Sequence, residues 1–325
     1  MTSRRRKTGF TITNLMFLVT PERLLGLVVL SLSLFATVTP YQVATAQAKM
    51  KAANPFAYDS KVPLDLHEVS VNEKDGVVIQ DVDYAGYTAR HGRIKAYIVK
   101  PKDTGRHAGI VFFHWLGDEK SDRTEFLDEA VGLARQGTVS VLIQGYFPWT
   151  EAPKEALADR QQVIDQTIEA RRALDLLLAQ PKVDRRRIAY VGHDYGAMFG
   201  SLVSGVDKRV KAYVLMAALG NFSDWSLHYW PVTASKGEDV YRQAFVDLEP
   251  INYVSSAAPA KLLFQFANTD KYIPKAAALG FFGAASVPKQ IKWYEAQHDL
   301  NVEAARHDRV EWLREQLGLT RRAGM

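Results

Sequence analysis

Short apolar runs alternate with longer amphipathic stretches over most of the chain. Runs of about four to eight apolar residues, rich in β-branched and aromatic side chains, are typical of buried strands. Longer stretches with apolar positions three and four apart are typical of helices. The strongest helical pattern covers 158–179, where Ile164, Ile168 and Leu174 fall at helical spacing and Pro181 ends the pattern.

The whole pattern predicts an α/β fold. Strands are expected over 77–82, 93–99, 109–114, 138–144, 187–192, 210–217, 261–267 and 290–294, and helices over 124–135, 158–179, 197–206, 274–285 and 302–317. This alternation implies a mostly parallel, doubly wound sheet covered by helices on both faces. No linker interrupts it, so we expect one domain over 75–325, preceded by a polar segment (49–74) and containing a short irregular insertion at about 219–259.

The first 48 residues have the layout of a secretory signal. Basic residues from Arg4 to Lys7 precede an apolar run from Leu24 to Val38, and small residues follow at Ala46-Gln47-Ala48. The apolar run is shorter than the roughly 20 residues that cross a bilayer as a helix. The sequence therefore predicts an exported protein, periplasmic or secreted. An N-terminal membrane anchor that is not cleaved is the alternative.

Charge and cysteine content narrow the classes of partner. The formal net charge is +5, but residues 1–48 contain five basic residues and one acidic residue, so the rest of the chain is nearly neutral. A nearly neutral body gives no reason to expect a nucleic-acid partner, and the membrane is expected as a partner only through an uncleaved N-terminal segment. The absence of cysteine excludes disulfides, cysteine-ligated zinc and a thiol nucleophile.

The most informative motif lies between a predicted strand and a predicted helix. Gly192 and Gly196 flank Asp194 in a G-x-nucleophile-x-G arrangement. A sharp strand-to-helix turn needs small flanking residues, because it strains the central residue and lifts its side chain off the sheet. The helix that follows directs free N–H groups at any developing negative charge. His193, which precedes the central residue, is expected to point away from the crevice and to make structural hydrogen bonds.

Two later residues complete a catalytic order. Asp270 follows the strand predicted at 261–267, and His298 follows the strand predicted at 290–294. The order of nucleophile, acid and histidine along the chain is that of hydrolases with a nucleophile elbow. Both residues lie just past the carboxyl ends of strands, where an open α/β sheet forms its ligand crevice.

Taken together, these motifs make the chain resemble the α/β-hydrolase superfamily, nearest to its dienelactone-hydrolase-like branch, over about 75–317. The resemblance also rests on the charged turn that leads into the elbow and on His114-Trp115-Leu116-Gly117, which is similar to the oxyanion loop of the superfamily. It implies that Asp194 is the nucleophile, His298 the base and Asp270 the acid that orients it. It further implies oxyanion donors at the N–H groups of Tyr195 and of Trp115 or Leu116.

An aspartate stands where most esterases and lactonases of this superfamily have serine or cysteine. With a reference pKa near 3.9, a carboxylate is already ionised at neutral pH and needs no base to activate it. Attack on an ester would give a reactive mixed anhydride, whereas attack on a carbon that carries a halide or a strained oxygen gives an ordinary ester. This arrangement resembles dehalogenases and epoxide hydrolases of the superfamily.

Three hypotheses remain open at this point. Asp194 is a covalent nucleophile acting on a small ester, lactone, epoxide or organohalide. Alternatively, Asp194 is a general base in an ester or lactone hydrolase. In the third hypothesis the chain is a non-catalytic binding protein on a hydrolase scaffold.

Several aromatic residues are candidates for the substrate pocket because of their position near the predicted crevice: His114, Trp149, Trp225, Tyr229 and Trp230. The chain has no metal-ligand spacing, no P-loop and no dinucleotide-binding fingerprint. We therefore expect a small-molecule substrate and neither a cofactor nor a metal.

Overall fold

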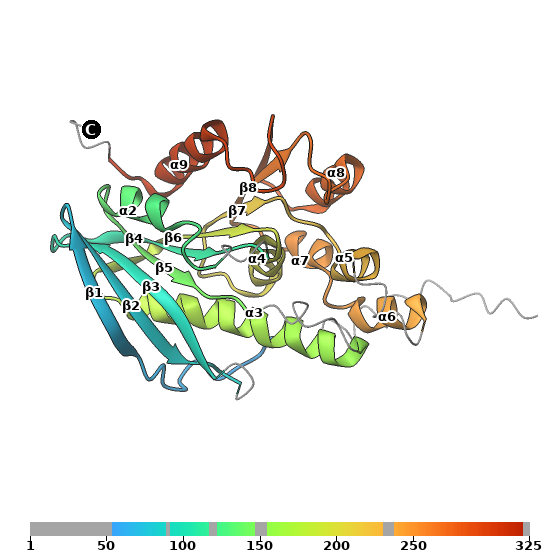
Figure 1. The fold of residues 1–325 in the computed structure, drawn as a ribbon, viewed down its shortest axis with the longest axis horizontal. Helices are drawn as coiled ribbons and strands as arrows, with labels where there is room; N and C mark the ends of the chain where they lie inside the picture. The colour runs from blue at the N-terminus through green and yellow to red at the C-terminus, as the bar shows by residue number, and fades with distance from the viewer. Residues whose placement is uncertain (1–53, 89–91, 117–121, 147–154, 230–236, 321–325) are drawn as a thin grey trace, which may run out of the picture. The chain divides into compact units, whose positions relative to one another are not determined.

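A nine-stranded sheet forms the centre of the domain (Figure 1). The computed structural model describes residues 54–88, 92–116, 122–146, 155–229 and 237–320. Its strands are β1 (His67–Lys74), β2 (Val77–Ala85), β3 (Arg93–Pro101), β4 (His107–Phe113), β5 (Thr138–Ile143), β6 (Val183–His193), β7 (Ala212–Met216), β8 (Lys261–Ala267) and β9 (Lys289–Tyr294). Its helices are α2 (Leu127–Ala134), α3 (Ala156–Ala179), α4 (Tyr195–Val206), α5 (Phe222–Tyr229), α6 (Glu238–Phe245), α7 (Pro250–Val254), α8 (Lys275–Ala284) and α9 (Glu303–Leu317).

The strand order is β1-β2-β3-β5-β4-β6-β7-β8-β9, and the sheet is parallel from β5 to β9. The first three strands continue it as an antiparallel extension. The chain passes from β4 outward to β5 and then returns to β6 on the other side of β4. The crevice of an open α/β sheet forms at such a reversal, beyond the carboxyl ends of the strands. The predicted mostly parallel α/β sheet is confirmed.

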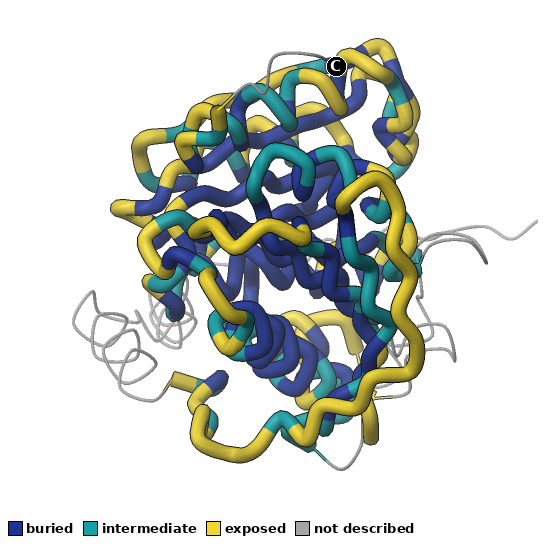
Figure 2. Tube along the Cα trace, turned by 90° about the vertical axis from the view of Figure 1, so that its left-hand side faces the viewer, coloured by how far each residue is buried: buried dark blue, intermediate teal, exposed yellow. Residues whose placement is uncertain are grey.

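Helices cover the sheet on both faces, as the alternating pattern predicts. On one face α2 and α9 contribute Leu133 and Leu313 to the core. On the other face α3, α4 and α8 contribute Leu174, Phe199 and Phe281. Figure 1 shows α3 on the opposite side of the sheet from α9. The central strands are buried on both faces because the helices exclude water from them (Figure 2).

Two segments have more regular structure than the sequence predicts. The polar segment 49–74 contains β1, an edge strand that is exposed along its whole length (Figure 2). The insertion at 219–259, expected to be irregular, contains α5, α6 and α7. In β1 only Val69 and Val71 alternate with polar residues, which is too short a run to predict a strand, and both side chains are exposed.

A buried arginine fastens the segment before β1 to the domain. Arg172 of α3 is fully buried, and its guanidinium donates to the carbonyl oxygens of Val62, Pro63 and Ala85 at 3.3, 3.2 and 3.0 Å. These carbonyl groups belong to the polar segment and to the end of β2, so a charge that would be costly to bury instead joins three parts of the chain. These contacts agree with the grouping of the residues from Asn54 onward into one compact unit.

The predicted leader, 1–48, lies outside the described residues, as do the predicted pocket residues Trp149 and Trp230. In the described ranges, no helix combines the length and the apolar character needed to cross a bilayer.

Candidate active site

Asp194 occupies a strained turn between β6 and α4. Its backbone has φ 50° and ψ −115°, a conformation that a residue with a side chain rarely adopts. The turn is possible because both neighbouring glycines lack a Cβ: one on Gly192 would overlap the carbonyl oxygen of Gly196, and one on Gly196 would overlap that of Phe113. The strain holds the carboxyl group of Asp194 over the end of the sheet, completely buried.

The three residues of the predicted catalytic order lie together. His298 Nδ1 is 2.8 Å from Asp270 Oδ2, and His298 Nε2 is 3.8 Å from Asp194 Oδ1. Backbone N–H groups of Tyr272 and Ile273 donate to the other oxygen of Asp270 at 2.8 and 3.1 Å. Burial alone would raise the pKa of Asp270, but the hydrogen bond from His298 and these N–H groups outweigh it and lower the pKa. The ionised Asp270 thus keeps the proton on Nδ1 and turns Nε2 towards Asp194.

The predicted oxyanion donors face the carboxylate of Asp194 itself. The N–H of Leu116 donates to Asp194 Oδ2 at 3.3 Å, and the N–H of Tyr195 also interacts with this carboxylate. The expectation that Trp115 could serve as the donor is wrong, because its N–H donates to Glu125 Oε2 at 3.0 Å. Asp194 Oδ1 has no hydrogen-bond partner among the described residues. One oxygen is therefore held, and the other faces His298.

Burial changes the ionisation expected for Asp194. It raises the pKa of Asp194 to about 7, although His298 and the N–H groups of Tyr195 and Leu116 favour the charged form. The expectation of full ionisation at neutral pH therefore needs correction. Because His298 Nε2 and Asp194 Oδ1 face each other, a proton that leaves Asp194 has a base beside it.

An aromatic cluster lies on the outer side of His298. It consists of Trp225 and Tyr229 from α5 and Tyr272 from the loop after Asp270. The ring of His298 is 4.8 Å from the ring of Tyr272 and 6.1 Å from that of Trp225. Trp225 Nε1 is buried and has no hydrogen-bond partner in the described ranges.

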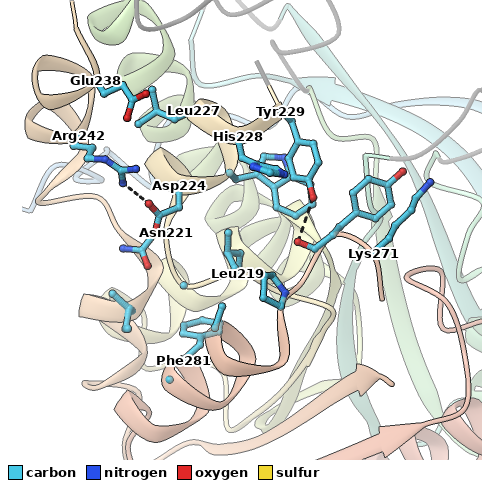
Figure 3. A pocket seen from close by; sticks show the side chains of 17 residues that line it. Leu219, Asn221, Asp224, Leu227, His228, Tyr229, Glu238, Arg242, Lys271 and Phe281 are labelled. Atoms are coloured by element: carbon cyan, nitrogen blue, oxygen red, sulfur yellow. Dashed lines mark hydrogen bonds and ion pairs between the residues drawn. The ribbon is translucent and has the colours of Figure 1, made fainter. Parts of the chain in front are cut away.

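Beyond this cluster a cavity of about 670 Å³ opens between α5, α6 and α8 (Figure 3). All three cluster residues line it, together with apolar side chains such as Leu219 and Phe281. Figure 3 shows Arg242 directed at Asp224, with which it forms an ion pair, and the hydroxyl of Tyr229 directed at the backbone beside Lys271. That hydroxyl donates to the carbonyl of Tyr272 at 3.3 Å. A cavity of this size can hold a small organic molecule. Its lining includes the aromatic cluster but none of Asp194, Asp270 and His298.

Of the predicted pocket residues that the structure describes, Trp225 and Tyr229 line the cavity, and His114 does not. His114 is buried behind the oxyanion loop, where its Nδ1 lies 2.8 Å from the carbonyl of Trp115 and its Nε2 accepts the N–H of Gly145 at 2.9 Å. It holds the loop rather than the substrate.

The sequence did not single out Tyr272 or Glu125. Tyr272 could have been found, because it follows Asp270 by two positions. Glu125 gives no signal, since the predicted helix around it assigns it to an ordinary helical surface. The described residues contain no group of three or more His, Cys, Asp or Glu side chains placed to hold a metal ion.

Comparison with known proteins shows which solved structures share this fold. No protein-family model and no curated protein sequence matches the chain. Among solved structures, it is similar to the acetyl xylan esterase from Paenibacillus sp. R4, with a TM-score of 0.62 and 17% identity over 86% of this chain and 94% of that one. It is also similar to the alpha/beta hydrolase GrgF from Penicillium sp. sh18, with a TM-score of 0.55 and 14% identity over 74% and 99% of the two chains.

The chain has the α/β-hydrolase fold. A third similar structure is an S-formylglutathione hydrolase from Agrobacterium tumefaciens, with a TM-score of 0.60 and 14% identity over 78% of this chain and the whole of that one. At such identities the likeness concerns the arrangement of the chain, and the chemistry has to be argued from the site.

Proposed function

We propose that the protein is a hydrolase in which Asp194 attacks a saturated carbon of a small organohalide or epoxide and forms a covalent ester. The observation that carries the proposal is the division of labour between the two oxygens of Asp194. Oδ2 accepts the N–H of Leu116, whereas Oδ1 has no hydrogen-bond partner in the described part of the chain. Oδ1 is therefore the oxygen that attacks.

The reaction proceeds in two steps. Oδ1 forms a bond to the carbon, and the halide or ring oxygen leaves with the bonding electron pair. His298 then takes a proton from water, and the hydroxide adds to Cγ of Asp194. Negative charge develops on Oδ2, where the N–H groups of Leu116 and Tyr195 stabilise it. Collapse expels the substrate oxygen as an alcohol, which receives the proton from His298, and leaves one oxygen of water in Asp194. The proton that remains on the Asp194 carboxyl passes to solvent after halide release, or to the alkoxide formed from an epoxide, and this restores the carboxylate.

The leaving group needs a hydrogen-bond donor, and Trp225 provides one. Its buried Nε1–H has no partner among the described residues, and leaving such a donor unsatisfied costs about 1–3 kcal/mol. A halide or alkoxide that leaves beside His298 would satisfy it. The ring of Trp225 is 6.1 Å from that of His298, which is within the span of a small substrate.

The cavity indicates an uncharged substrate. Its charged residues occur in equal numbers of each sign: Asp224 is paired with Arg242, and Glu238 and Lys271 carry opposite charges. Such a lining does not favour an anion or a cation. The apolar side chains on the cavity wall would hold a hydrocarbon body.

Ester hydrolysis with Asp194 as general base is the competing function. The printed names of two similar structures, an acetyl xylan esterase and an S-formylglutathione hydrolase, favour it, and a pKa of about 7 suits a base at neutral pH. An ester, however, needs the oxyanion donors for its own carbonyl oxygen. Because Asp194 Oδ2 already engages the N–H of Leu116, we prefer the covalent route.

A single turnover in ¹⁸O-water tests the proposal. A panel of 1-bromobutane, styrene oxide and p-nitrophenyl acetate is offered to excess enzyme, and the peptide that contains Asp194 is then weighed by mass spectrometry. Turnover with label in Asp194 is expected, and Asp194→Asn should be inactive, while the exposed Asp128→Asn should match wild type. Turnover without label would establish the general-base route. If no member of the panel is turned over, and binding of these compounds survives Asp194→Ala, the binding-protein hypothesis is favoured.

A further inference from the structure

His193, the residue before the proposed nucleophile, joins three segments of the active site. Its side chain is completely buried. Its Nδ1 lies 2.7 Å from Glu125 Oε1, and its Nε2 lies 2.9 Å from the backbone carbonyl oxygen of His298. Its ring also stacks on Trp115, with centroids 5.2 Å apart and an angle of 15° between the planes.

The partners of His193 determine where its protons are. A carbonyl oxygen only accepts hydrogen bonds, so Nε2 must carry a proton. The other ring nitrogen faces a carboxyl oxygen, so a second proton lies on Nδ1 or on Glu125, shared across 2.7 Å. If this second proton is missing and Glu125 is ionised, Nε2–H still donates to the carbonyl of His298, but two acceptors face each other at the Nδ1–Glu125 contact.

Glu125 extends the connection to the oxyanion loop. Its second oxygen, Oε2, accepts the N–H of Trp115 at 3.0 Å. The next N–H in the chain, that of Leu116, donates to Asp194 Oδ2. The position of this oxyanion donor therefore depends on a carboxylate that itself makes no contact with Asp194 in the described hydrogen bonds.

We propose that Glu125 and His193 are positioning residues that set the N–H of Leu116 and the ring of His298 against Asp194. On one side of the site, Glu125 holds the N–H of Trp115 and with it the oxyanion loop. On the other side, His193 holds the backbone carbonyl of His298. The catalytic part of the inference rests on the proposed function, but the positioning itself is open to measurement without a substrate.

Other charged groups surround the pair. Asp194 and His298 lie on the catalytic side, and His114 lies behind the oxyanion loop, where burial lowers its pKa while the charge of Glu125 raises it. On the side of α9, Arg309 is buried and ion-paired with Glu129, and the charge of Glu125 also helps to raise its pKa.

Two substitutions of Glu125 separate positioning from charge. In Glu125→Gln the amide can still accept the N–H of Trp115 and donate to Nδ1 of a neutral His193, so the connections survive. In Glu125→Ala both are lost. His193→Phe keeps the stacking on Trp115 and removes both hydrogen bonds. Asp128→Ala, on the exposed side of α2, is the matched control.

NMR spectroscopy of the full chain labelled with ¹⁵N provides the readout without substrate. In wild type we expect a proton on Nε2 of His193, a second proton shared between its Nδ1 and Glu125, and slow exchange of the Trp115 amide proton. Glu125→Gln should leave Nδ1 of His193 without a proton but keep the slow amide. Glu125→Ala should accelerate exchange of the Trp115 amide proton and shift the NMR signals of the Leu116 amide and the His298 ring. His193→Phe should shift the signals of the His298 ring. Unchanged Leu116 and His298 signals in both Glu125→Ala and His193→Phe would overturn the proposal.

Steady-state kinetics with 1-bromobutane and p-nitrophenyl acetate supplies the catalytic readout. We expect Glu125→Ala and His193→Phe to lower kcat about 10- to 100-fold with little change in KM. A misplaced hydrogen-bond donor reduces the stabilisation of the transition state more than it reduces the binding of the substrate. Glu125→Gln should retain most of the activity. Equal losses in Glu125→Gln and Glu125→Ala would contradict positioning. If wild type turns over neither probe, the proposed function fails, and the NMR measurements still decide whether the pair positions the site.

Discussion

Replacing Asp194 with asparagine is expected to stabilise the protein at alkaline pH while it abolishes the chemistry. Burial raises the pKa of Asp194 from 3.8 to about 7. Raised proton affinity means that the native state favours the protonated carboxyl more than the unfolded chain does. The contribution of Asp194 to the free energy of unfolding is therefore fully present below about pH 4 and is lost as the pH rises to about 7. Above pH 7 the total loss is about 4 kcal/mol, at roughly 1.4 kcal/mol for each tenfold change in proton affinity.

Asparagine keeps the contacts and removes the ionisation. Its carbonyl oxygen can accept the N–H of Leu116, and its amide can donate to His298 Nε2. Asparagine also tolerates positive φ better than most residues, so the strained turn is preserved. The advantage of Asp194→Asn over wild type should therefore widen by about 2–3 kcal/mol between pH 5 and pH 8.

Urea unfolding of the full chain at both pH values measures this difference. Asp128→Asn, a substitution of an exposed carboxylate on α2, should show no such widening. A variant at position 194 that is no more stable than wild type at pH 8, or that gains equally at both pH values, would refute the reasoning. Either result would mean that the site solvates the Asp194 carboxylate better than its burial suggests.

Four further outcomes are expected. Gly196→Ala should destabilise the fold by about 3 kcal/mol or more in urea, because its Cβ would overlap a backbone oxygen, whereas Gly132→Ala, with open space around it, should be close to neutral. Arg172→Met should cost about 2–4 kcal/mol in the same assay, because three carbonyl groups lose their donor, and the exposed Arg186→Met should not. Trp225→Phe should lower kcat for 1-bromobutane about tenfold with little effect on KM, as measured by the release of bromide. In a pH profile, kcat/KM should rise with pH through about 7 as the nucleophile ionises.

These outcomes can fail in distinct ways. A Gly196→Ala protein as stable as wild type would mean that the turn relaxes. An Arg172→Met protein of unchanged stability would mean that water satisfies the carbonyl groups. Unchanged kcat in Trp225→Phe would remove this donor from the mechanism. A profile that falls with rising pH through 7 would contradict an ionised nucleophile.

The parts of the site that the sequence predicted are those with a local signature. Asp194 sits between two glycines at a strand-to-helix turn, and Asp270 and His298 each follow a strand, so local pattern and chain order were sufficient to select them. The structure brings the three side chains together at the carboxyl edge of the sheet. The alternation of buried strands and helices likewise predicted the parallel part of the sheet, because burial on both faces leaves continuous apolar runs.

What the sequence could not predict depends on contacts between distant segments. Glu125 acts through His193, 68 positions later, and no periodicity marks such a pair. Strand β1 lies exposed at the edge of the sheet, and its only alternating apolar residues, Val69 and Val71, are too few to predict a strand. The pKa of Asp194 depends on how completely it is buried, which the reference value for the free side chain does not contain. Helices α5 to α7 were missed because each has eight residues or fewer, which is too short a stretch for the helical period to stand out.

The engagement of Asp194 Oδ2 by the N–H of Leu116 has a consequence for the substrate range of the proposed enzyme. The carbonyl group that water attacks belongs to the protein, so the second half of the reaction presents nearly the same bond to the same donors whatever substrate entered. Substrates would then differ mainly in the first half, in the fit of their body to the cavity and in the quality of their leaving group. A change in the cavity wall could therefore redirect selectivity towards a new substrate without any loss of hydrolytic power.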